Sequence, residues 1–115
     1  MTIDADFRTI ALAFPGAVEH AHARHPDFRV NGKVFASLGD PDEAWGTVML
    51  TPEEQQHFIA TAPESFQPAP GPAGKQGETR VHLATTDHHQ LRDALIAAWR
   101  GKTPKRMRDQ FHEHE

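Results

Sequence analysis

The sequence predicts an α+β domain in which an antiparallel β-sheet is backed by helices. Two kinds of local signal favour this class. Asn31-Gly32 lies between two apolar runs, and this dipeptide is the strongest short signal for a β-hairpin. Thr51 and Asp87 each open a segment of helical periodicity with a capping box, which marks the start of a helix. The length of 115 residues fits a single domain over residues 1–115.

The first helix is expected from about Ile3 to Ala13. Thr2 is a candidate N-cap, and Pro15 ends the segment because the residue before a proline avoids the α region. Apolar residues recur at helical spacing at Ile3, Phe7, Ile10, Ala11 and Phe14.

The hairpin joins Phe28–Val30 to Lys33–Leu38 through a two-residue loop. A type I′ turn needs a positive φ at both central positions, which Asn and Gly tolerate. The preceding residues Val18–His22 are a candidate further strand. The expected register places Phe28 opposite Phe35, and apolar residues on both faces then predict cover on both sides of the hairpin. One face would hold Phe28, Val30 and Phe35, and the other would hold Val34, Ala36 and Leu38.

The remaining elements complete the expected order α-β-β-β-β-α-β-α. A strand at Gly46–Leu50 leads into a helix that ends at Pro63, and the Pro- and Gly-rich segment Pro63–Gly77 is expected to be a mobile loop. A strand at Thr79–Leu83 precedes the last helix, which runs to about Gly101. From about residue 103 the chain becomes a basic and His/Glu-rich tail for which we expect disorder.

Composition excludes several classes of function. The chain has no cysteine, which excludes disulfides and thiol catalysis. Acidic residues, Asp4 and Asp6, lie where a signal peptide would be basic, and no apolar run approaches the ~20 residues that span a bilayer. These features predict a cytoplasmic protein with no membrane partner. The formal net charge of −4 disfavours nucleic-acid binding at the level of the whole chain.

No catalytic motif is evident, so we expect a non-enzymatic protein without a cofactor. Neither serine, Ser37 nor Ser65, lies in a nucleophile elbow, and Gly71–Lys75 lacks the spacing of a phosphate-binding loop. Nine histidines raise the question of a metal. His20 and His22 would share a strand face with His25 nearby, but a closed zinc site needs about four ligands. We therefore assign no metal site, and whether these three histidines bind a metal stays open.

Cationic residues are concentrated after the last helix. On one face with Arg29 and Lys33 of the hairpin, and with Lys75 and Arg80 around the last strand, they could follow a phosphate backbone. The alternative is a solvated helix extension whose charges complement the helix C-terminus, and the residues alone favour this alternative. The cluster consists of Arg100, Lys102, Lys105, Arg106 and Arg108, with no acidic residue among them.

Six segments carry a family resemblance along nearly the whole chain. They are Ala13–Ala17, His25–Ala36, Leu50–Glu54, Phe66–Pro70, Thr79–Val81, and Ala98-Trp99 followed by Pro104–Arg106. In this order they resemble the MmcQ/YjbR family of small bacterial proteins. The resemblance implies a compact fold akin to secretion-chaperone-like domains. It also implies DNA binding, because the paired hairpins of the family suggest a double-wing arrangement.

The leading hypothesis is a non-enzymatic protein that binds double-stranded DNA through hairpin wings and a basic C-terminal segment. A chaperone-like or adaptor module that binds another protein is the alternative, and a small ligand between sheet and helices is a third. The polar residues of the matching motifs are the candidate DNA-binding residues, namely Arg29, Lys33, Arg80, Lys105 and Arg106.

Overall fold

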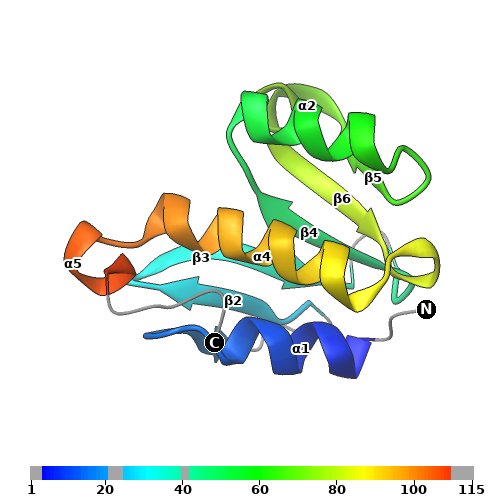
Figure 1. Cartoon of the computed structure of the whole chain (residues 1–115). Coiled ribbons are helices and arrows are strands. Elements are labelled where there is room, and N and C mark those ends of the chain that lie inside the picture. Colours follow the sequence, from blue (N-terminus) through cyan, green and yellow to red (C-terminus); the bar gives the residue numbers. More distant parts are fainter. Residues whose placement is uncertain (1–3, 21–24, 40–41, 110–115) are drawn as a thin grey trace.

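The computed structural model describes residues 4–20, 25–39 and 42–109. Its six strands form one antiparallel sheet in the order β1-β2-β3-β4-β6-β5 (Figure 1). The α+β class and the antiparallel sheet backed by helices are confirmed. The strands are β1 (Val18–His20), β2 (Asp27–Val30), β3 (Lys33–Leu38), β4 (Trp45–Met49), β5 (Phe66–Pro68) and β6 (Glu78–His82).

Within the described ranges, three longer helices and three short helical segments accompany the sheet. None of the helices in the described ranges is long and apolar enough to cross a bilayer. The helices are α1 (Asp4–Leu12), α2 (Pro52–Thr61), α3 (Gly71–Lys75), the 3₁₀ turn η1 (Leu83–Thr85), α4 (His88–Lys102) and α5 (Lys105–Arg108).

The longer helices α1, α2 and α4 pack on the same face of the sheet (Figure 1). Phe7 of α1 contacts Phe28 of β2 with ring centres 5.8 Å apart, and Phe58 of α2 contacts Phe66 of β5 at 5.2 Å. Trp99 of α4 is fully buried, as expected for a core residue. The residues that alternate with the core positions along the strands face the other way, and we call that side the open face. The core face includes four residues that are neighbours across successive strands and are all fully buried, namely Phe28, Ala36, Val48 and Thr79.

The hairpin turn is as predicted, but its register is not. Asn31 and Gly32 have φ of 54° and 77°, as a type I′ turn requires. A β-bulge then pairs Phe28 with Ala36 instead of Phe35. Because the bulge inserts one residue into β3, Phe35 and Ala36 are both fully buried although they are consecutive. The expected division was therefore wrong for Ala36, which shares the face of Phe28, while Val34 pairs with Arg29 on the opposite face.

The Pro- and Gly-rich segment is not the loop that we expected, since it contains β5 and α3. Phe66 pairs with Val81 and is buried, which anchors β5 at the edge of the sheet. The buried side-chain amide of Gln55 donates hydrogen bonds to the carbonyl oxygens of Gly74, at 2.9 Å, and Glu78, at 3.1 Å. These contacts fix the backbone of the segment to α2.

Both predicted capping boxes are present and open α2 and α4. The Thr51 hydroxyl accepts a hydrogen bond from the Glu54 amide at 3.1 Å, and the Asp87 carboxylate accepts one from the Gln90 amide at 2.7 Å. The candidate N-cap of the first helix, Thr2, lies outside the described residues. Local signals thus place the starts of two helices correctly.

The start of the expected tail is helical, because α5 occupies Lys105–Arg108. Thr103 is buried, and its hydroxyl donates to the carbonyl oxygen of Trp99. The Met107 thioether packs against the core, beside Gly16. These contacts join the segment to α4 and the sheet, while residues 110–115 lie outside the described part.

Candidate nucleic-acid interface

Two connections between strands leave the same end of the sheet. Met49 pairs with Glu78, so β4 ends where β6 begins, and the antiparallel β3 starts at this end as well. The β2–β3 turn around Asn31 and the β5–β6 connection that contains α3 therefore both project from it. We call them the hairpin wing (residues 30–33) and the α3 wing (residues 69–77).

The short helix α5 lies against the hairpin wing. A Cβ placed on Gly16 would lie 3.0 Å from Met107 Sδ and 3.4 Å from Val30 Cγ2, so these two side chains meet over the same glycine. Val30 in turn pairs with Lys33 across the turn. Figure 1 shows the tip of β2 and β3 beside α5 at the left of the molecule. The hairpin wing and the basic segment after α4 thus share one end of the structure.

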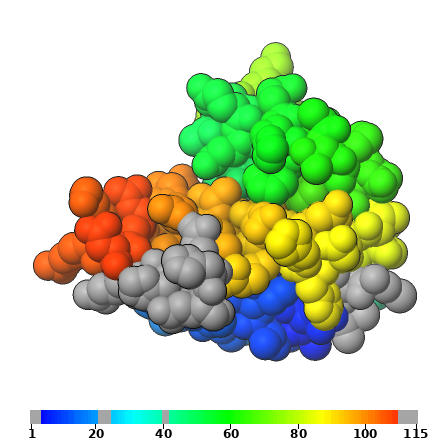
Figure 2. All heavy atoms as spheres, in the orientation of Figure 1, coloured from blue at the N-terminus to red at the C-terminus, as the bar shows by residue number. Residues whose placement is uncertain are grey.

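This shared end carries most of the clustered cations, and we call it the basic end. In Figure 2 the end of α4 and α5, in orange and red, form a protruding corner of the surface. Two of its cations, Lys33 and Arg106, are exposed and make no ion pair or hydrogen bond from the side chain to another described residue. The basic end consists of Lys33, Arg100, Lys105, Arg106 and Arg108.

Two side chains of the basic end have partners within the segment. Lys105 Nζ lies 3.1 Å from Asp109 Oδ2, and these side chains are 80% and 62% exposed. Ion pairs this exposed contribute little, so a phosphate can replace the carboxylate at small cost. Arg108 Nη1 donates to the carbonyl oxygen of Arg100 at 3.3 Å, which ties α5 to the end of α4.

The other two predicted residues, Arg29 and Arg80, lie on the open face. Arg29 makes a bidentate pair with Asp27, with Nε–Oδ1 at 3.0 Å and Nη2–Oδ2 at 3.2 Å. The hydrogen bond to Asp27 raises the pKa of Arg29 above its ordinary value, and the pair is neutral as a whole. Residues two apart on a strand share a face, so the alternation of Asp27 and Arg29 was a readable signal for this pairing.

Arg80 is distant from the other candidates. It lies in β6, where it pairs with Thr47 of β4 and Gln67 of β5. Three strand spacings separate β6 from β2, which corresponds to roughly 14 Å between Arg80 and the strand of Arg29. The structure therefore brings Lys33, Lys105 and Arg106 together and leaves the two arginines of the open face apart from them.

Trp45, whose position the sequence left undecided, lies on the open face. Its ring stacks on the imidazole of His82, with ring centres 4.6 Å apart and an interplanar angle of 26°. Val18 of β1 is 50% exposed on the same side of the sheet. The open face thus combines apolar and polar groups and has no excess of positive charge.

The histidine question is not answered by the described residues. His20 lies in β1 and His25 is exposed, while His22 lies outside the described part. Among the described residues, no group of three or more His, Cys, Asp or Glu side chains could hold a metal ion.

Comparison with known proteins decides the family. The YjbR family model matches residues 12–101. The chain belongs to the YjbR family. The match includes Arg29, Lys33 and Arg80, whereas α5 with Lys105 and Arg106 lies beyond its end. No curated protein matches this sequence.

A solved structure agrees with this YjbR assignment at the level of the fold. It is the crystal structure of a Deinococcus radiodurans protein with a DUF419 domain, which superposes with a TM-score of 0.71. The identity is 18%, and the alignment covers 96% of this chain and 88% of the other. At that identity the likeness concerns the fold alone.

Proposed function

We propose that this YjbR protein is a non-enzymatic protein that binds double-stranded DNA by its phosphate backbone, through the basic end. One observation carries the proposal. Residues 100–109 contain five cations and one acid, and the structure joins this segment to Lys33 of the hairpin wing. Cations gathered in this way release condensed counterions when they contact phosphates, which drives association.

The basic end also reconciles DNA binding with the acidic net charge. Acidic side chains elsewhere on the chain bring the formal charge to −4, but screening limits their effect beyond about 8–10 Å at moderate salt. A local positive surface can therefore attract DNA although the molecule as a whole is negative. The proposal assigns the phosphate contacts to Lys33, Lys105 and Arg106, and none to the neutralised Arg29.

The first prediction concerns the double variant Lys105→Ala/Arg106→Ala. Fluorescence anisotropy with a labelled DNA duplex over a series of salt concentrations should show weaker binding. The slope of log K against log salt should become shallower by about 2, because each phosphate contact contributes about 0.9.

The matched control is the double variant Arg80→Ala/Arg92→Ala, which removes the same charge elsewhere. Arg80 is on the open face, and Arg92 lies in α4 about 20 Å from the start of α5, at 1.5 Å per helical residue. This control should bind DNA like the parent. An equal loss in both variants, or a parent that does not bind at low salt, would contradict the proposal.

The open face favours a second candidate, a chaperone-like or adaptor module that binds another protein. It has no cover from the longer helices and presents the half-exposed Val18 on β1 and, three strands away, the stacked Trp45–His82 pair. If this reading holds, Val18→Asp should abolish the interaction with a purified partner in a pull-down. Lys105→Ala/Arg106→Ala should leave that interaction intact, and the opposite pattern would remove the case for the adaptor.

A further inference from the structure

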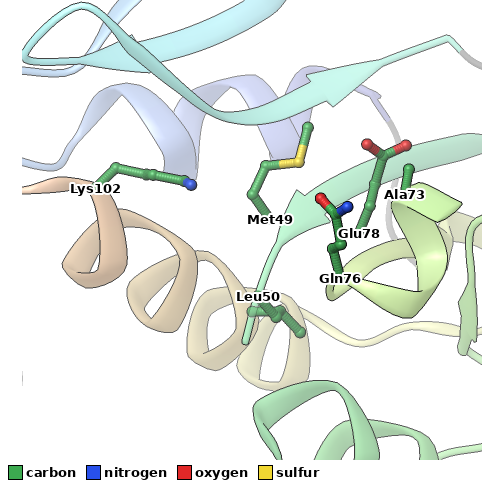
Figure 3. Close-up of a pocket in the computed structure, with 6 residues that line it drawn as sticks. All are labelled: Met49, Leu50, Ala73, Gln76, Glu78 and Lys102. Carbon is green, nitrogen blue, oxygen red and sulfur yellow. The ribbon is translucent and has the colours of Figure 1, made fainter. Parts of the chain in front are cut away.

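A small cavity lies between the α3 wing and the end of α4, where β4 ends and β6 begins (Figure 3). Its volume is about 140 Å³. It is lined by Met49, Leu50, Ala73, Gln76, Glu78 and Lys102. The cavity is distinct from the basic end, although Lys102 comes from the same run of cations in the sequence.

Two opposite charges, those of Lys102 and Glu78, line the cavity. In Figure 3, Lys102 extends from the end of α4 toward Met49, while Glu78 and Gln76 stand on the other side. The side chains of Lys102 and Glu78 belong to half-buried residues. Neither makes an ion pair or hydrogen bond from its side chain to another described residue. A charge that is partly withdrawn from water and has no partner is energetically unfavourable. A ligand group of opposite charge offsets the lost hydration energy.

The floor of the cavity is apolar. Leu50 is 6% exposed and Met49 is half-buried between the two charged groups. The backbone here is fixed, because the Leu50 amide donates to the carbonyl oxygen of Gly77 at 3.2 Å. Rigid walls around an apolar floor, with polar groups at opposite sides, are typical of small-molecule sites.

We propose that this cavity binds a small zwitterion, an amino acid whose carboxylate contacts Lys102 Nζ and whose ammonium group contacts the Glu78 carboxylate. The short carbon chain between the two groups would lie on Met49 and Leu50. The volume of about 140 Å³ is small, so we expect a ligand of amino-acid size.

A series of amino acids with increasing separation of the two charges tests the proposal. The probes are glycine, β-alanine, 4-aminobutyrate and 5-aminovalerate, added to protein with ¹³C-labelled methionine methyl groups. The Met49 signal should shift in a saturable way with at least one member, while Met107 in α5 should not respond. Butylamine and butyrate, which each lack one charge of 4-aminobutyrate, should bind at least roughly tenfold more weakly than the best probe.

Variants separate this site from the DNA surface. Glu78→Gln keeps the shape of the side chain and should weaken binding of the best probe by roughly tenfold or more, as loss of one charge-assisted contact predicts. It should leave DNA binding unchanged. Lys105→Ala/Arg106→Ala should weaken DNA binding and leave binding of the best probe unchanged.

The charge exchange Lys102→Glu/Glu78→Lys tests whether weaker binding in Glu78→Gln results from the lost charge or from loss of folding. It should recover binding of the probe in the reversed orientation. No Met49 shift with any probe, or unchanged affinity in Glu78→Gln, would overturn the proposal whatever the result with DNA.

Discussion

Replacing Gly77 by alanine is expected to leave little folded protein. Gly77 has φ of +115°, a backbone conformation that residues with a side chain rarely adopt. A Cβ there would lie 1.9 Å from the carbonyl oxygen of Leu50 and 2.7 Å from its carbonyl carbon. Both are backbone atoms that a side-chain rotation cannot move. The expected loss of unfolding free energy exceeds about 4 kcal/mol, a large part of the roughly 5–15 kcal/mol of a typical domain.

Two other glycines provide graded controls for the same chemical change. At Gly32, φ is +77° but no atom lies within 4 Å of the added carbon, so alanine should cost only about 1–2 kcal/mol from the backbone conformation. At Gly101 in α4 nothing lies within 4 Å, and alanine should stabilise the helix by up to about 1 kcal/mol. Thermal unfolding followed by circular dichroism measures all three. If Gly77→Ala melts like Gly32→Ala, the close approach of Gly77 to Leu50 is wrong.

Replacing Gln55 by leucine should have the second-largest effect. Gln55 is 4% exposed, and its Nε2 donates to the carbonyl oxygens of Gly74 and Glu78 and to Thr79 Oγ1, the last at 3.2 Å. Leucine has a similar volume but no donor, so backbone acceptors that are buried or nearly so would lose their partner. The expected loss of unfolding free energy is about 3 kcal/mol, since each unsatisfied group costs about 1–3 kcal/mol.

The neighbouring residue Gln56 gives the matched control, because it is exposed on the same helix. Gln56→Leu should change the unfolding free energy by less than about 0.5 kcal/mol. Urea titration separates the two variants by their midpoints. Hydrogen exchange should also be faster in α3 of Gln55→Leu than in the parent. Equal midpoints for the two leucine variants would show that the amide of Gln55 does not hold the α3 wing.

The elements predicted correctly depend on short stretches of sequence. The capping boxes at Thr51 and Asp87 act within one helical turn, and the Asn31-Gly32 turn acts within four residues. Such signals keep their meaning in any fold. The fold class followed from them and from the alternation of apolar residues along the strands.

The elements that were missed depend on contacts between distant residues. The bulge in β3 lets Phe35 and Ala36 both enter the core, where Phe14 contacts the Phe35 ring at 6.5 Å between centres. No local pattern reveals that requirement. The α3 wing likewise depends on Gln55, which is nineteen residues before Gly74 in the sequence.

The candidate sites divide in the same way. Lys105 and Arg106 were apparent because they are neighbours in the sequence, and their proximity to Lys33 required the fold. Lys102 and Glu78 line one cavity only because the fold places the end of α4 near the start of β6. Neither residue spacing nor composition predicts that two charged residues so far apart in the sequence line the same cavity.

The edge strand β5 has a consequence for how the molecule behaves in concentrated solution. It has only three residues, and the last of them, Pro68, has no N–H group to offer a further strand. A short edge that ends in proline is a poor template for pairing with a strand of another copy. On this side the sheet is therefore protected against growth into fibres, and a substitution of Pro68 by a β-branched residue would weaken that protection.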